Sequence, residues 1–393
     1  MENQLKLTKQ QLNVAIEQHL KSDNGLNDLF ELMLNGLMLS ERSQFLNHSK
    51  FNKGNGYRSV KKPGLGRQME LRIPRDRLGV FRPVIMGLVD QHDQELKELS
   101  FALYGKGLTT REISTILQQV YGKAYSKSSV SLISQQFGQQ INAYMNRRLN
   151  SFYSVIFIDA LYLKVRRESV CTEAYYVLLG LKPDFTREVL SIVNLPTESA
   201  AGWQTILRQV KERGIEKVGL FVFDNLKGLD SSIHSVYPSS SLQKCILHFQ
   251  RNLSRQIRVK DRALFCSQLK EVFKPDEKDY TSKQAIIALK QVLGNWSKNY
   301  PKLKKVIERD DLEMLFTYLK FDYRIRRMLY TTNWIERLNK SFKRTTKIRN
   351  ALPTPNAAML LLGYVAQQMN ENTYKYPISN FKFDEQFNQW SIN

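Results

Sequence analysis

The chain has 393 residues, of which 42% are hydrophobic and 24% charged, a composition that excludes wholesale disorder and suits about two or three domains. Lys and Arg outnumber Asp and Glu by 59 to 37, so the formal net charge is +22. A charge of this size is typical of proteins that bind a polyanion, and it disfavours an enzyme of small metabolites. A ribosomal or simply basic surface protein is the alternative.

Three features of the sequence bear on where the protein works. The longest nearly unbroken apolar stretch, residues 357–366, is about half of a bilayer span, so we expect no transmembrane helix and no membrane partner. The N-terminal sequence lacks the apolar centre of a signal peptide, and three scattered cysteines do not suit a disulfide scaffold. A cytoplasmic location is therefore expected.

Residues 1–50 are expected to form an N-terminal helical region, because their apolar residues recur at helical spacing. A basic β-ribbon and helical region follows at 51–105, where Met69, Leu71 and Ile73 alternate with polar residues as in a short strand. Arginines in such a ribbon would follow a phosphate backbone, although a solvated ribbon is the alternative. The arginines of this region are Arg67, Arg72, Arg75, Arg77 and Arg82.

Residues 106–150 carry the pattern of a helix-turn-helix. A capping-box sequence at 109–112 begins the first helix, and a glycine ends it. A second helix is expected to begin at Ser126, with Lys127 and Ser129 in its first turn. The N-terminal end of a recognition helix reaches the base edges of DNA, so these two side chains are candidates for reading DNA. A helical hairpin that only packs is the alternative.

From residue 151 onward the pattern changes to strands. The predicted order is strands at 155–165, 175–181 and 187–193, a helix near 198–213, a strand at 218–224, a helix near 227–236 and a strand at 242–245. Three strands joined by tight turns favour an antiparallel meander, and helical crossovers add parallel strands. This order, β-β-β-α-β-α-β, is that of the α/β ribonuclease H-like fold. We expect its first part at 151–245, an all-helical insertion at 246–328, and its C-terminal helical part at 329–393.

Two carboxylates fall on strands that this order makes neighbours. Asp159 lies inside the first strand, where a charge is costly to bury unless a cation or hydrogen-bond donors hold it. Asp224 ends the fourth strand, and α/β folds place ligands at the carboxyl ends of strands. Facing carboxylates repel each other, as a site for Mg²⁺ or Mn²⁺ requires. A strand-end turn is the alternative for Asp224.

Glu336, near the start of an amphipathic helix, is the candidate for a third carboxylate. Asn333 precedes it by three residues, so the two form a capping-box sequence in which Glu336 would only bind the helix N-terminus. The polar face that Glu336 shares with several lysines suits either a solvated helix or a DNA track beside a metal ligand. The basic residues of this helix are Arg337, Lys340, Lys343, Arg344 and Lys347.

Cys245 and His248 have the spacing of half a zinc site, but a tetrahedral zinc site needs two more ligands. Cys171 and Cys266 offer no paired spacing, so zinc is not expected. A buried cysteine with a hydrogen-bonded histidine is one interpretation of the pair, and support of a neighbouring active site is the other. Trp296 lies on an apolar helical face, which favours a place in the core over stacking on a base.

Several of these segments resemble the Mutator-type bacterial insertion-sequence transposases, a family with an Asp-Asp-Glu triad on a ribonuclease H-like core. The matching pieces are FIDALYLKVR, FDNLKGLDSSIHSVYP followed by QKCILHFQRN, and TTNWIERLNKSFKRTTK. Upstream, YRSVKKPGLGRQMELRIPRDRLGVF and LTTREISTILQQVYGKAYSKSSVS also look like that family. The resemblance therefore covers roughly residues 55 to 350.

The resemblance implies that Asp159, Asp224 and Glu336 are the catalytic and metal-binding triad, holding two Mg²⁺ or Mn²⁺ ions. Cys245 and His248 match a family signature, and with Asn333 they are expected to support the active site. The family commonly has Gly at position 160 and Ala-His at positions 225–226, where this chain differs.

The expected activity is that of a transposase that binds terminal inverted repeats and cuts and joins double-stranded DNA, including target DNA. It would act as a homodimer on DNA, at the bacterial nucleoid. A DNA-binding regulator with a vestigial nuclease-like core is one alternative. A DNA nuclease that hydrolyses without joining is the other.

Overall fold

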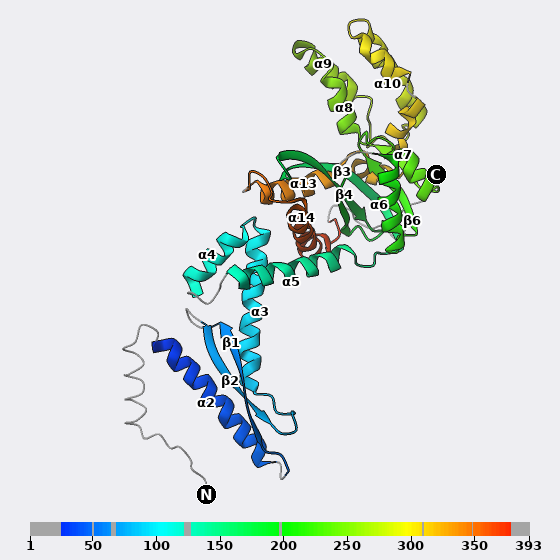
Figure 1. The fold of residues 1–393 in the computed structure, drawn as a ribbon. Coiled ribbons are helices and arrows are strands. Elements are labelled where there is room, and N and C mark those ends of the chain that lie inside the picture. Colours follow the sequence, from blue (N-terminus) through cyan, green and yellow to red (C-terminus); the bar gives the residue numbers. More distant parts are fainter. Residues whose placement is uncertain are drawn as a thin grey trace. The chain divides into compact units, whose positions relative to one another are not determined.

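The computed structural model describes residues 25–48, 51–63, 68–121, 127–195, 199–308, 310–347 and 349–378. The chain forms two compact units, Met1–Gln139 and Gln140–Asn393 (Figure 1). Among the described residues, no helix combines the length and the apolar character that crossing a bilayer requires.

The first unit contains a two-stranded sheet with helices. Its elements are α2 (Gly25–Asn47), β1 (Gly54–Pro63), β2 (Gln68–Asp76), α3 (Val84–Gly105), α4 (Thr110–Tyr121) and α5 (Lys127–Met145), whose last residues belong to the second unit. The strands β1 and β2 pair antiparallel, and Leu34 of α2 packs with Met69 and Leu71 of β2. The predicted alternation is confirmed over residues 69–72, where Met69 and Leu71 are buried and Glu70 and Arg72 are exposed. It ends there, because Ile73 is only partly buried and Pro74 is buried.

The predicted capping box at the start of α4 is also confirmed. Thr109 Oγ1 accepts a hydrogen bond from the Glu112 backbone N–H at 3.2 Å, and the Glu112 carboxylate accepts one from the Thr109 backbone N–H at 2.7 Å. This exchange satisfies donors that the first turn of a helix leaves unpaired. The second predicted helix is α5, and residues 122–126 before it lie outside the described part of the chain.

The second unit is built on a five-stranded mixed sheet in the order β5-β4-β3-β6-β7. Its strands are β3 (Phe152–Arg166), β4 (Val170–Leu181), β5 (Arg187–Asn194), β6 (Lys217–Phe223) and β7 (Ser241–Lys244). The first three pair antiparallel, whereas β6 and β7 run parallel to β3. The strands and crossovers therefore have the predicted order, and the chain is a mixed α/β protein.

Helices cover both faces of this sheet (Figure 1). On one face, α6 (Ala200–Glu212) and α7 (Leu229–Val236) bury Trp203 and Ile206 against side chains of the sheet such as Ile156. On the other face lie α13 (Asn333–Thr346) and α14 (Pro355–Met369), which contact β3 and β5. A central strand buried on both faces has a continuous apolar run, which explains the sequence of β3 before Asp159.

Between β7 and α13 the described chain is helical, as predicted for an insertion. Its elements are α8 (Ile246–Ser254), α9 (Val259–Lys270), α10 (Ser282–Ser297), α11 (Lys304–Ile307), α12 (Tyr323–Leu329) and 3₁₀ turns at Pro301–Leu303, Asp310–Leu315 and Thr317–Lys320. A π-helical turn, Asn370–Tyr374, follows α14. Trp296 packs its ring 5.3 Å from that of Phe265 and donates a hydrogen bond to Gln268 at 2.7 Å. It thus joins α10 to α9, as expected for a packing residue.

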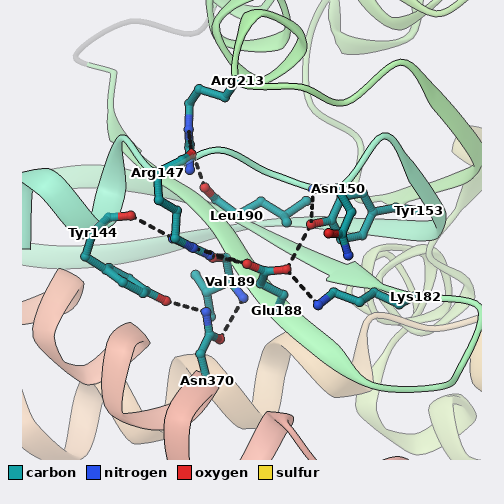
Figure 2. A network of polar contacts seen from close by, with 10 residues as sticks. All are labelled: Tyr144, Arg147, Asn150, Tyr153, Lys182, Glu188, Val189, Leu190, Arg213 and Asn370. Atoms are coloured by element: carbon teal, nitrogen blue, oxygen red, sulfur yellow. Dashed lines mark hydrogen bonds and ion pairs between the residues drawn. The ribbon is translucent and has the colours of Figure 1, made fainter.

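A network of polar contacts joins β5 to neighbouring segments of the second unit (Figure 2). The Glu188 carboxylate accepts hydrogen bonds from the Arg147 guanidinium at 2.7 Å and the Tyr153 hydroxyl at 2.9 Å. Lys182 Nζ lies 3.1 Å from the same carboxylate. Asn370 accepts a hydrogen bond from the β5 backbone at 2.9 Å. The network therefore fixes the edge strand to the chain that follows α5 and to the C-terminal helical turn.

We expect Glu188→Gln to lower the free energy of unfolding by about 2 kcal/mol, the typical value of hydrogen bonds to a charged group. Burial raises the pKa of Glu188, but the hydrogen bonds and charge of Arg147 and the charge of Lys182 outweigh it and hold the pKa below its usual value. A depressed pKa contributes stability above the unfolded pKa of about 4.3, and this contribution is lost as pH falls through the folded pKa.

Denaturant unfolding from pH 7 to pH 3 measures this effect. The difference in the free energy of unfolding between the original protein and Glu188→Gln should be largest at pH 7 and should shrink below about pH 4. Glu168→Gln, at an exposed position in the turn between β3 and β4, is the matched control and should change little. A gap that does not depend on pH would contradict an electrostatic role for Glu188.

Candidate active site

Asp159 lies on the central strand β3, directly after the apolar run that ends at Ile158. Its exposed fraction is 8%. Side chains alternate along a strand, so Asp159 projects from the face of β3 opposite to that of Ile158. On that face, Asn339 of α13 donates a hydrogen bond from Nδ2 to Asp159 Oδ2 at 2.8 Å. The donor lowers the cost of burying this carboxylate.

Asp224 follows the last residue of β6. Because Ile158 pairs with Phe223 in the parallel register, Asp224, at the end of β6, lies beside Asp159 in the middle of β3. Asp224 Oδ1 accepts a hydrogen bond from the backbone N–H of Asn225 at 2.7 Å. The strand-end turn considered from the sequence is therefore present. Asp224 Oδ2 lies toward His248, as described below, so the turn uses one oxygen only.

Glu336 lies in the first turn of α13, and it does not cap that helix. The N-terminal residue of the cap is Thr332, Asn333 is the first helical residue, and no side chain makes a capping hydrogen bond. The capping-box alternative is therefore wrong. Glu336 Oε1 instead accepts a hydrogen bond from the Arg251 guanidinium at 3.1 Å, across from α8. Asn333 is exposed, and its supporting role stays a prediction.

His248 lies between two of the acids. Its Nδ1 is 3.7 Å from Asp224 Oδ2, and its Nε2 is 3.5 Å from Glu336 Oε1. The neighbouring Cys245 and the negative charges of Asp224 and Asp159 raise the pKa of His248 to about 9, although burial opposes this rise. At neutral pH the imidazole is therefore a cation between carboxylates.

The pKa of Asp159 shows that the three acids share one electrostatic environment. Burial raises the pKa of Asp159 to about 6. His248 opposes that rise, whereas the negative charges of Asp224 and Glu336 contribute to it. Like charges disfavour one another's ionised forms only at short range or in a poorly solvated site. The fold thus brings together all three carboxylates that the sequence singled out.

Cys245 connects the end of β7 to the start of α13. It is buried and immediately precedes α8. Its sulfur lies 3.1 Å from Thr332 Oγ1, and the Thr332 backbone N–H donates to it at 3.4 Å. Since Thr332 begins the turn that carries Glu336, this contact helps to place Glu336 beside His248.

The described residues contain no group of three or more His, Cys, Asp or Glu side chains arranged to hold a metal ion. Asp224 and Glu336 flank His248, Arg251 also contacts Glu336, and the strand register places Asp159 beside Asp224. The two cationic side chains neutralise part of the acidic charge.

Asn339 is a site residue that the sequence analysis missed. Its Oδ1 is buried and has no hydrogen-bond partner, while its Nδ2 holds Asp159. A buried oxygen without a partner is costly, and a hard cation is one partner that it suits. Three carboxylates and an amide oxygen are the donors that Mg²⁺ and Mn²⁺ prefer, so the residues fit such an ion. The sequence signal was the position of Asn339 three residues after Glu336, on the same side of the helix.

The helix α13 is amphipathic as predicted. Ile335, Leu338 and Phe342 are buried. The guanidinium of Arg187, from β5, lies 4.8 Å from the ring centre of Trp334 and helps to hold the helix on the sheet. The five basic residues that the sequence assigned to a DNA track are exposed; they are Arg337, Lys340, Lys343, Arg344 and Lys347.

The candidate DNA contacts of the first unit lie on β2 and on α5. Arg72 and Arg75 are exposed on β2, and Arg77 is exposed just after it. Lys127 and Ser129 lie in the first turn of α5, but their side chains lie outside the described residues.

Acidic side chains at the edge of a mixed sheet, next to an exposed basic helix, are typical of enzymes that transfer phosphoryl groups in nucleic acid. The family described as "Transposase, Mutator family" matches residues 1–376. The chain belongs to this family of transposases, and it is an enzyme of the kind that bacterial insertion sequences encode.

The transposase for insertion sequence element IS905 of Lactococcus lactis subsp. lactis (strain IL1403) is 35% identical to this chain over 336 residues, covering 83% of this chain and 84% of that protein. The transposase for IS1201 of Lactobacillus helveticus is 30% identical, with 89% and 97% covered. The transposase for IS256 in transposon Tn4001 of Staphylococcus aureus is 28% identical, with 93% and 95% covered.

Among solved structures, the Drosophila P element transposase strand transfer complex matches 71% of this chain and 80% of that chain. The identity is 9% and the TM-score 0.28, a likeness too low to support an argument about the fold.

Proposed function

We propose that this transposase cuts DNA at terminal inverted repeats and joins the ends to target DNA, using Asp159, Asp224 and Glu336 as its catalytic carboxylates on a ribonuclease H-like core. The observation that carries the proposal is the convergence of the three acids. They come from β3, from the end of β6 and from α13; Asp159 lies beside Asp224 in the strand register, and His248 lies between Asp224 and Glu336. The strand order of the sheet supports the assignment of the core.

Two divalent ions, Mg²⁺ or Mn²⁺, would be held by the three carboxylates. When bound, such ions activate a water or a DNA 3′-hydroxyl and stabilise the leaving oxygen of an in-line displacement. The chain's own residues prepare the site. Asn339 orients Asp159 through its hydrogen bond, while His248 and Arg251 lower the repulsion between the acids by their positive charge.

DNA would be held by the exposed basic side chains. On the second unit these belong to α13, which also carries Glu336, so bound phosphates would lie next to the carboxylates. On the first unit Arg75 lines a cavity of about 630 Å³ together with Arg58 and Arg82. A helix-turn-helix at 106–150 would read the repeats through Lys127 and Ser129. Joining requires two ends at once, which favours a homodimer on DNA, working at the nucleoid in the cytoplasm.

Cleavage and joining by the purified chain test this function. Duplexes that carry the element's ends should be cut with Mg²⁺ and left intact with EDTA, and the cut ends should appear joined to an added target duplex. Cutting without joining would favour the alternative that the protein is a DNA nuclease that only hydrolyses DNA. Specific binding without cutting would favour the regulator with a vestigial core.

The basic face of α13 predicts a change in the salt dependence of DNA binding. Each lysine that contacts a phosphate releases condensed counterions, so Lys343→Ala or Lys347→Ala should reduce the slope of log affinity against log salt by about one unit. The loss should be similar on end DNA and on random duplex, because phosphates carry no base information. Affinity measured at several salt concentrations gives the slope.

The matched control is Lys217→Ala, an exposed lysine at the other end of the strand that Asp224 follows. It should leave the slope unchanged. Thermal unfolding of all three variants checks that the fold is intact. If the two α13 variants melt normally and keep the original slope, this helix does not touch DNA.

A further inference from the structure

A cavity of about 230 Å³ opens beside the candidate active site. Asp224 lines both, so a group bound in the cavity lies next to a carboxylate proposed to act on the DNA backbone. One wall is a face of α8, where Phe249, Asn252 and Leu253 recur at helical spacing, and Gln256 from the turn after this helix adds to it. Val306 of α11 and Asp311 and Leu315 of the 3₁₀ turn that follows it also line the cavity.

The cavity combines apolar walls with amide groups at its opening. Leu253 and Leu315 are buried and Phe249 is partly buried, whereas Asn252 and Gln256 are exposed. The Phe249 ring is held in place by an edge contact with another phenylalanine, with ring centres 6.4 Å apart. A ligand with flat apolar faces and hydrogen-bonding edges would match this arrangement.

The charges that line the cavity exclude a phosphate as the natural occupant. Lys244 is the one cation among the lining residues, and it is paired with Asp311. Asp224 adds a further negative charge, so the lining is acidic overall. The sugar and the base of DNA carry no charge, and of the two only the base has flat apolar faces with hydrogen-bonding edges. The volume lies below the roughly 300–1,000 Å³ of pockets for drug-sized ligands, and it therefore suits a single base.

We propose that this cavity receives one DNA base, turned out of the helical stack, from a nucleotide adjacent to the phosphate that is cut. Asn252 and Gln256 would hydrogen-bond the base edge, as amide side chains do in nucleic-acid recognition. Leaving the stack costs energy, and the contacts in the cavity offset that cost. The base then anchors the strand so that its phosphate lies at the carboxylates. This inference rests on the proposed function of the site.

The test uses the full-length chain, in EDTA, with end duplexes that carry 2-aminopurine in turn at each nucleotide flanking the mapped cut. The fluorescence of this base rises when it leaves the stack, so we expect a rise at one position upon binding. Val306→Phe, which fills the cavity from α11, should abolish the rise. Gln250→Ala, on α8 but outside the cavity lining, is the control and should leave it intact.

A second arm removes the base from the DNA. Asn252→Ala and Gln256→Ala should each weaken binding of the normal duplex by about tenfold, and neither should weaken binding of a duplex with an abasic nucleotide at that position. Equal losses on both duplexes, or a full rise in Val306→Phe, would overturn the inference. A protein that cuts its ends with Mg²⁺ but shows no rise at any position refutes the base site alone. A protein that does not cut refutes the proposed function instead.

Discussion

Asp159→Asn, Asp224→Asn and Glu336→Gln should each reduce DNA cleavage about a thousandfold or more while leaving binding of the element's ends intact. Each change keeps the size of the side chain and removes one negative charge from the site. Metal-assisted phosphoryl transfer draws several kcal/mol of transition-state stabilisation from the bound ions, and about 1.4 kcal/mol corresponds to a tenfold change in rate. Cleavage of labelled end duplexes with Mg²⁺ measures the rate, and a gel-shift titration measures binding.

Glu216→Gln is the matched control, because Glu216 is exposed just before β6, at the end of that strand remote from Asp224. It should cut at the original rate. The decisive variant is Glu336→Gln, since its amide oxygen still accepts a hydrogen bond from Arg251. Full activity in this variant would mean that Glu336 serves only to hold Arg251 and His248 in place.

Much of the core could be predicted because its signals are local in the sequence. A strand buried on both faces must be apolar throughout, so β3 and β6 appeared as continuous runs. A carboxylate inside or directly after such a run is conspicuous, which is why Asp159 and Asp224 were found. The antiparallel and parallel pairings then followed from the tight turns and the helical crossovers between strands.

Contacts between distant parts of the chain could not be predicted in the same way. Asn339 and Asp159 are 180 residues apart, and Arg251 and Glu336 are 85 apart. No periodicity links such pairs, because the fold alone brings them together. The capping-box interpretation of Glu336 failed for a related reason. A local motif predicted a local hydrogen bond, but the tertiary contacts with Arg251 and His248 take the carboxylate away from the helix end.

The Glu188 network was missed because each of its members is unremarkable by itself. Arg147, Lys182 and Glu188 look like ordinary surface charges in the sequence, and only the packing of β5 against the chain after α5 partly buries them (Figure 2). A charged residue on an edge strand is usually solvated. The sequence therefore gave no reason to expect a buried cluster here.

Asn339→Leu should lower the cleavage rate about 10- to 100-fold, the usual effect of removing a residue that orients a metal ligand. Leucine has nearly the same size and suits the buried position, so the main loss is the hydrogen bond to Asp159 and the unpartnered amide oxygen. The affinity of the free protein for Mn²⁺, followed by electron paramagnetic resonance, should fall by a similar factor. Cleavage and metal affinity would then move together, as they must if Asn339 acts through the site that holds the ion.

Two further variants separate positioning from packing. Asn339→Asp keeps the size and supplies an oxygen but loses the N–H donor, so it should retain Mn²⁺ affinity better than Asn339→Leu while still cutting slowly. Ser341→Ala, two residues further along α13, changes a hydroxyl that contacts only the helix backbone and should alter neither property. If Asn339→Leu binds Mn²⁺ as the original chain does and melts at a lower temperature, Asn339 is a packing residue. Its unpartnered oxygen would then only lower the stability of the fold, and it would not bind a metal ion.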